Sequence, residues 1–167
     1  MSWEETLRTV VRKYYRSGVV DPPSWVTEQR ESRPEPITVS NDTCGDRVVV
    51  YLESLHPGME RTGRMWLDVA GCAICKASAE MVASAADRLS PPELIEFAHE
   101  MTTWLQGTEQ SATEQSAVQD DSPPTLPSDA IPAEDLEAIL MVREIPGRRR
   151  CASLPWEAVL RAVDGSR

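Results

Sequence analysis

Residues 64–89, RMWLDVAGCAICKASAEMVASAADRL, contain the change from strand to helix on which the predicted fold depends. The first seven residues are rich in apolar and aromatic side chains and predict a β-strand. The Ala-rich stretch after them repeats its apolar residues at helical spacing and predicts an α-helix. Cys72 and Cys75 form a Cys-x-x-Cys pair at the point where the strand gives way to the helix.

The strands lie before this point and most of the helices lie after it. ITVS (37–40) and RVVVYLESL (47–55) are β-branched strand candidates, and short turns would join them and 64–70 as an antiparallel meander. A Ser-capped helix at the N-terminus and a Pro-rich connector precede them. Helices are expected at 90–107 and 132–145, and a closing helix just after Cys151. Strands followed by helices predict one α+β domain, a three-stranded antiparallel sheet packed by helices, over residues 1–167.

One segment differs from the rest in composition. Residues 108–130 contain TEQSA twice, are polar, acidic and Pro-rich, and offer little apolar surface to bury. Burial there cannot offset the entropy cost of ordering the chain, so we expect a disordered acidic insertion within the domain.

The charge pattern excludes some classes of partner. The net charge is −10, and eleven acidic residues and no Lys or Arg lie between Leu89 and Val142. No basic face for phosphate groups is apparent, so we expect no nucleic-acid partner. No apolar run approaches membrane-spanning length and no cleavable leader is seen, so we expect a soluble, cytoplasmic protein with no membrane partner. Because the cytosol keeps thiols reduced, four cysteines there favour metal binding or catalysis over disulfides.

The cysteines occupy separate elements, as the ligands of a shared metal site do. Cys44 lies in the turn-like NDTCGDR (41–47), and Cys151 ends an arginine run and begins the expected last helix. A four-ligand site drawn from Cys44, Asp46, Cys72, Cys75 and Cys151 has one ligand too many. For Cys75 the role of a small buried hydrophobic residue is equally consistent with its Ala-rich surroundings.

Three motifs resemble a known family. NDTCGDR (41–47), GCAICKASAEMV (71–82) and RRRCASLPWEAV (148–159) resemble, in order, the three cysteine motifs of the NifU/IscU/SufU family of iron–sulfur assembly proteins. LRTVVRKYYRSG (7–18) resembles the first helix of that family. The resemblance implies that Cys44, Asp46, Cys72 and Cys151 bind the metal. It also implies that Cys75 is an extra thiol at a position usually held by a small residue.

The resemblance is greatest to the SufU-like branch. Arg150 stands where IscU-type proteins usually carry a histidine, and the segment between the last two motifs is long. This branch is implied to bind Zn²⁺ and to accept persulfide sulfur from a SufS-type cysteine desulfurase, one of whose histidines takes a coordination position and frees a cysteine. We expect Cys44 to be the acceptor, because a loop can move, and Arg148 to lie close to the site. Asp42 departs from the family, where a proline is usual.

Two other functions stay open from the sequence. The same ligands could bind iron and assemble a [2Fe–2S] cluster for transfer to apo-proteins, with downstream iron–sulfur assembly proteins as partners. Alternatively the zinc could be purely structural. The missing histidine favours sulfur transfer, whereas a fourth thiol at Cys75 could complete an all-sulfur site suited to a cluster or to inert zinc.

Overall fold

The structure is a computed structural model that describes residues 2–15, 21–28, 31, 33–53, 60, 62–107, 122–125 and 130–164. Its strands are β1 (Ile37–Asn41), β2 (Asp46–Leu52) and β3 (Met65–Ala70). Its helices are α1 (Trp3–Tyr14), α2 (Ser24–Thr27), α3 (Ala73–Ala86), α4 (Pro91–Gln106), α5 (Ala133–Leu140), the 3-10 turn η2 (Met141–Glu144) and α6 (Pro146–Asp164). None of the described helices is long and apolar enough to cross a membrane.

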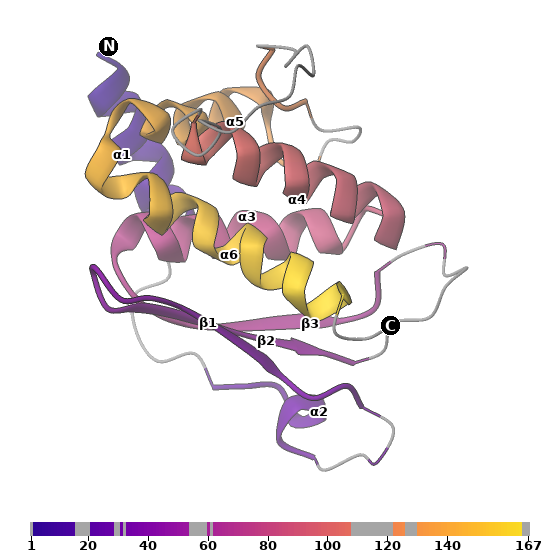
Figure 1. Cartoon of the computed structure of the whole chain (residues 1–167). Coiled ribbons are helices and arrows are strands. Elements are labelled where there is room, and N and C mark those ends of the chain that lie inside the picture. The colour runs from indigo at the N-terminus through magenta and orange to yellow at the C-terminus, as the bar shows by residue number, and fades with distance from the viewer. Residues whose placement is uncertain are drawn as a thin grey trace, which may run out of the picture.

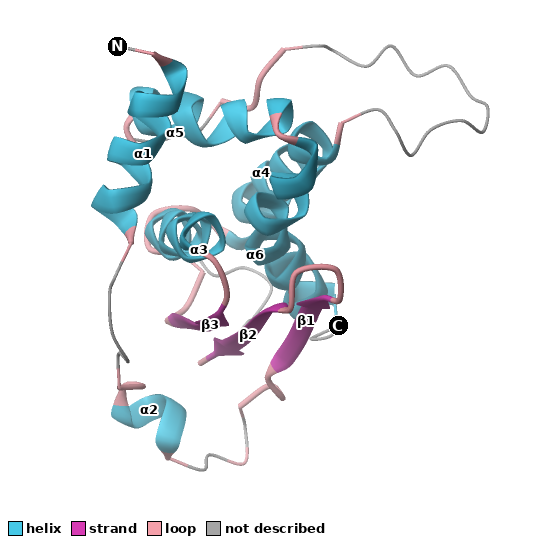
Figure 2. Cartoon of the chain, turned by 90° about the vertical axis from the view of Figure 1, so that its left-hand side faces the viewer, coloured by secondary structure: helices cyan, strands magenta, loops and turns pink. Residues whose placement is uncertain are grey.

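The predicted α+β fold with a three-stranded antiparallel sheet is confirmed (Figure 1). The strand order is β1-β2-β3, and each strand pairs with its neighbour in sequence. Helices α3 and α6 lie on one face of this sheet, with α4 beyond them (Figure 2). Helix α2, which lies within the Pro-rich connector and was not expected, is on the other side of the sheet (Figure 1).

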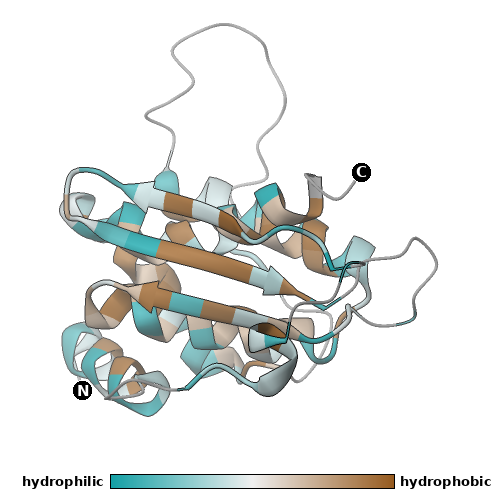
Figure 3. Cartoon of the chain, turned by 90° about the horizontal axis from the view of Figure 1, so that it is seen from below, coloured by the Kyte–Doolittle hydropathy of each residue, from teal (hydrophilic) through white to brown (hydrophobic). Residues whose placement is uncertain are grey.

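The central strand supplies much of the apolar contact between the sheet and its helices. Val48, Val50 and Leu52 are all buried, and alternate residues of a strand point to the same face. Figure 3 shows this strand as an apolar stretch that follows a polar start. These side chains pack in one buried cluster with Cys75 and Cys151, so two of the four cysteines are part of the core between the sheet and the helices.

Buried polar contacts join α3 to α6. Ser78 donates its hydroxyl to the carbonyl of Ala152 at 2.6 Å, and the indole of Trp156 donates to the Ser78 hydroxyl at 3.0 Å. The Trp156 ring also packs edge-on against Phe97 of α4, with ring centroids 5.3 Å apart. Because buried polar groups are costly to leave unpaired, this network favours one relative placement of the two helices. Cys72 directly precedes the first of these helices, and Cys151 lies in the second.

The predicted start of the last helix is wrong. Helix α6 begins at Pro146, so Cys151 lies inside the helix instead of just before it. Proline is favoured in the first turn of a helix, and both Pro146 and Pro155 offer that signal. The helix uses Pro146 and continues through Pro155, whose missing N–H leaves the carbonyl of Cys151 without its usual helical partner.

The predicted disordered insertion at 108–130 lies mostly outside the described residues. Within it, Ser122–Thr125 and Ala130 are described, and Pro124 is buried. At least one residue of this range therefore packs against the folded part of the chain.

Candidate metal centre

A hairpin loop places Cys44 and Asp46 at one end of the sheet. Asn41 and Asp46 pair across β1 and β2, and residues 42–45 form the turn between them. Gly45 has φ of 75°, a conformation that is strained for residues with a side chain. Its N–H donates to the carbonyl of Asn41 at 2.8 Å, which closes the turn and directs Cys44 and Asp46 toward the same end of α6.

Helix α6 brings Cys151 to this loop from the other side. The sulfur atoms of Cys44 and Cys151 lie 3.7 Å apart. Ligand atoms of Cys44, Asp46 and Cys151 all lie within 4.8 Å of one another. The structure thus brings together three of the four predicted metal ligands, from a loop, a strand and a helix that are distant in sequence.

Asp46 is the buried acid of the site, at 3% exposure. Its Oδ1 accepts the backbone N–H of Cys72 at 3.0 Å, whereas Oδ2 is buried and accepts no hydrogen bond of normal geometry in the described part of the chain. Burial opposes ionisation, but the nearby thiols of Cys151 and Cys44 and the Cys72 amide outweigh it, so the pKa of Asp46 is lowered. A thiol is only a weak donor and does not fully satisfy a carboxylate oxygen. Oδ2 is therefore an oxygen that a cation would satisfy.

Cys72 and Cys75 differ although one helical turn separates them. Cys72 precedes the first residue of α3, is half-buried, and its thiol also contributes to the low pKa of Asp46. Its sulfur is not in the group of atoms within 4.8 Å, so its ligand role stays a prediction. Cys75 is fully buried, and burial followed by the charges of Asp46 and Cys72 raises its pKa.

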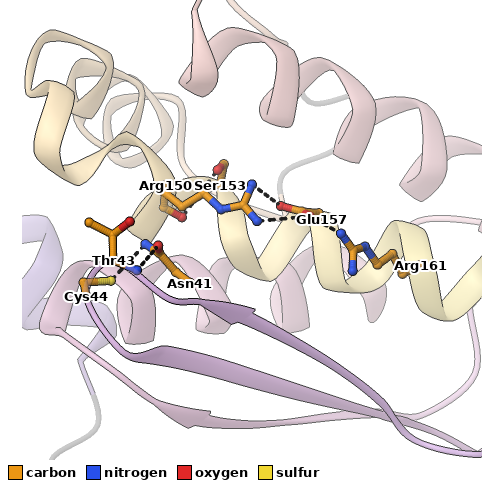
Figure 4. A network of polar contacts seen from close by, with 7 residues as sticks. All are labelled: Asn41, Thr43, Cys44, Arg150, Ser153, Glu157 and Arg161. Carbon is orange, nitrogen blue, oxygen red and sulfur yellow. Dashed lines mark hydrogen bonds and ion pairs between the residues drawn. The ribbon is translucent and has the colours of Figure 1, made fainter. Parts of the chain in front are cut away.

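Of the three consecutive arginines, one faces the site. Contact with the Cys151 thiol, followed by the charge of Cys72, raises the pKa of Arg148. The cation is stabilised because it lies beside these sulfur atoms. Arg149 donates Nε–H to the carbonyl of Arg143. Arg150 pairs with Glu157, which also binds Arg161 (Figure 4). Arg148 therefore lies beside the site, as expected from the sequence.

The donor set fits a zinc ion. Zinc binds thiolate sulfur at about 2.3 Å in tetrahedral sites, which places two such sulfurs roughly 3.8 Å apart, close to the separation of Cys44 and Cys151. Without a cation, burial and contact with Asp46 raise the pKa of Cys151, so that its thiol is protonated at neutral pH. A divalent ion reverses this balance, because metal binding releases the thiol proton.

Comparisons with known proteins find a curated relative and solved structures with the same fold. No family model matches the chain. The zinc-dependent sulfurtransferase SufU of Bacillus subtilis (strain 168) is 25% identical over 127 residues, which cover 76% of this chain and 73% of that protein. This similarity supports the resemblance of the three cysteine motifs to the NifU/IscU/SufU family.

Two solved structures have the same fold as this chain. The N-terminal part of a nitrogen-fixing NifU-like protein from Brucella abortus matches with a TM-score of 0.67 at 17% identity, over 99% of this chain and 97% of that one. A candidate iron–sulfur cluster assembly scaffold protein for the SUF system from Fervidobacterium islandicum AW-1 matches with a TM-score of 0.57 at 18% identity, over 93% and 91%. At these identities the likeness concerns the fold alone.

Two residues of the site were not singled out from the sequence. Gly71 has no room for a side chain, because a Cβ atom there would lie 2.8 Å from Asp46 Oδ1. Arg47 pairs with Ala70, so Asp46, which precedes Arg47, and Gly71, which follows Ala70, meet at the end of the sheet. Asn41 donates its side-chain amide to the sulfur of Cys44. The position of Gly71 directly before Cys72 was the sequence signal that could have indicated its role.

Proposed function

We propose that this chain is an iron–sulfur cluster assembly protein of the SufU type, a zinc-dependent sulfurtransferase that accepts persulfide sulfur from a cysteine desulfurase. The observation that carries the proposal is the convergence of Cys44, Asp46 and Cys151 within 4.8 Å, beside Cys72. The zinc-dependent sulfurtransferase found among the curated relatives supports this choice of metal and reaction.

Cys44, Asp46, Cys72 and Cys151 would hold the ion. Bound zinc keeps cysteine thiols deprotonated at neutral pH and has no redox chemistry of its own. Asp46 is suited to this role because its low pKa makes it a carboxylate before metal arrives. A carboxylate is also a harder ligand than a thiolate, which favours exchange at that position.

Cys44 is the acceptor in this proposal because it is exposed, whereas Cys151 is fully buried. Its thiolate attacks the outer sulfur of the persulfide on the desulfurase. A new S–S bond forms to Cys44 as the S–S bond of the donor breaks, and the donor cysteine leaves as a thiolate. The exchange needs no external oxidant or reductant. Arg148 provides a positive charge beside the site, which favours anionic sulfur there.

Metal analysis of protein purified without oxygen tests the proposal. One zinc ion per chain and no visible chromophore are expected. Iron together with acid-labile sulfide would contradict the zinc sulfurtransferase and support a [2Fe–2S] scaffold that uses the same residues.

The Asp46→Ala variant provides a second test that distinguishes the zinc-dependent sulfurtransferase from the [2Fe–2S] scaffold. We expect at least about tenfold weaker zinc binding and impaired sulfur acceptance, because an open position admits water to the site. Asp68→Ala is the matched control, since Asp68 is an exposed acid on β3 away from the cysteines. A stable coloured cluster in Asp46→Ala reconstituted with iron and sulfide would contradict the proposal, since loss of the exchangeable oxygen ligand is expected to prolong the life of a cluster.

A further inference from the structure

Asn41 lies at the base of the loop that carries Cys44 and is the one asparagine of the chain. Its side chain is 7% exposed, and its Nδ2 lies 2.9 Å from the sulfur of Cys44 (Figure 4). Its Oδ1 accepts the backbone N–H of Thr43 at 3.2 Å. Its own carbonyl accepts the N–H of Gly45. Asn41 therefore contacts each of the last three residues of the turn.

The orientation of the Asn41 amide follows from these contacts. The backbone N–H of Thr43 can only donate, so the side-chain oxygen of Asn41 must face it. The amide NH₂ is then left to face the sulfur of Cys44 and donates a hydrogen bond to it. Sulfur accepts such a bond best when it is negatively charged, as a metal-bound thiolate is.

Cys44 needs such a contact more than the other predicted ligands do. Cys151 is fixed inside α6, and Cys72 is the N-cap residue of α3, whereas Cys44 is exposed on a turn. A side chain on an exposed turn loses rotational freedom when it is confined to one position. Hydrogen bonds to metal ligands offset this cost by fixing the direction in which the ligand atom points.

We propose that Asn41 is a positioning residue that directs the sulfur of Cys44 toward Asp46 and Cys151. It also provides a hydrogen bond that remains available to this sulfur while Cys44 carries the transferred atom. The second statement rests on the proposed sulfur transfer, whereas the first concerns this chain alone. Because Asn41 is buried, its proposed effect on transfer is exerted through Cys44.

Asn41→Asp tests the role in transfer. The variant keeps the oxygen that accepts the Thr43 N–H and replaces the donating NH₂ with an oxygen. We expect the rate of sulfur acceptance at saturating desulfurase to fall about tenfold, while the KM for the desulfurase stays within about twofold. The control Ser40→Asp adds the same charge at the neighbouring exposed position and should stay within about twofold of the unmodified protein. Equal rates for Asn41→Asp and Ser40→Asp would overturn the proposal.

A nuclear magnetic resonance measurement tests the positioning without any desulfurase. Because the chain has one asparagine, labelling with [¹⁵N]asparagine gives one side-chain NH₂ signal pair. Cys44→Ala should shift this pair and speed exchange of one of its protons with water at least about fivefold. Cys72→Ala, which also removes a predicted ligand, should leave the protection in place, because the bond to Cys44 does not depend on Cys72. An unchanged signal in Cys44→Ala would overturn the positioning role. A responsive signal in a protein that accepts no sulfur would refute the proposed function and leave the positioning intact.

Discussion

Cys44 and Cys151 hold their sulfur atoms 3.7 Å apart in opposite surroundings. Cys151 is fully buried in the middle of a helix, in one cluster with Leu154, Ala158 and the valines of the sheet. Cys44 is exposed on a four-residue turn that a left-handed glycine closes. Moving Cys151 would disturb the core, whereas Cys44 can move with its turn alone. The site thus combines a fixed sulfur with an accessible one, which is the division that the proposed sulfur transfer requires.

Removal of the accessible sulfur should have the largest effect. Cys44→Ala is expected to abolish stimulation of a SufS-type cysteine desulfurase, because no other exposed thiol is found among the four cysteines. Cys75→Ser should retain most of the stimulation, since Cys75 lies in the core outside the group of converging ligands. The assay is sulfide or alanine release with each variant in excess. Equal loss in the two variants would contradict the ligand assignment.

The contrast between exposed and buried thiols also predicts different reactivity. After zinc is removed with a chelator, iodoacetamide at pH 7.5 should modify Cys44 at least about tenfold faster than Cys151 or Cys75. Burial raises the pKa of both buried thiols, so the reactive thiolate becomes appreciable there only as the pH rises well above neutral. Mass spectrometry of digested samples over time gives the rate at each residue. Equal rates at Cys44 and Cys151 in the folded protein would show that the two thiols do not differ in accessibility, which contradicts the comparison.

Gly71→Ala tests whether zinc binding depends on the position of the Asp46 carboxylate. The added Cβ would lie 2.8 Å from Asp46 Oδ1, so the carboxylate must shift. We expect zinc affinity to fall about tenfold. Gly147→Ala is the matched control, because its Cβ would meet nothing within 4 Å, and it should leave zinc affinity unchanged. Competition with a chromophoric chelator measures both affinities.

Changes to the acidic segment 108–130 should have the smallest effects. Its polar composition offers little apolar surface that could pack against Cys44 or Cys151. Deletion of 108–121, joined by a short Gly/Ser linker, should leave zinc content and the thermal midpoint nearly unchanged. Deletion of 108–129 also removes Pro124, which is buried, and should lower the midpoint by a few degrees. Loss of zinc in the shorter deletion would show that the segment contributes to the metal site.

Much of the fold could be predicted from the sequence because local signals and packing agree there. The β-branched runs of β1 and β2 indicate strands and nothing else. Ser90 likewise indicates the start of a helix, and it is the N-cap residue of α4. The start of α6 was mispredicted because Cys151 was taken as the start of the helix, whereas the helix begins at Pro146, a residue favoured in the first turn. Helix α2 was missed because four residues beside prolines give no usable period.

The site was predictable in its residue types but not in its contacts. The cysteine motifs indicated Cys44, Asp46, Cys72 and Cys151, and the structure brings three of them together and places Cys72 beside them. The contacts of Arg149 and Arg150 with Arg143 and Glu157 depend on where α6 begins, and no sequence pattern gives them. The same holds for the approach of Gly71 to Asp46, which follows from strand register.

Mass spectrometry of the protein after reaction with a cysteine desulfurase and cysteine can locate the transferred sulfur on the chain. The sample is quenched with an alkylating reagent and digested without reductant, so that any persulfide stays on its residue. We predict a gain of one sulfur atom at Cys44, with Cys72, Cys75 and Cys151 unmodified. Additional sulfur at Cys75 or Cys151 with none at Cys44, or no transferred sulfur on a zinc-loaded chain, would contradict this prediction.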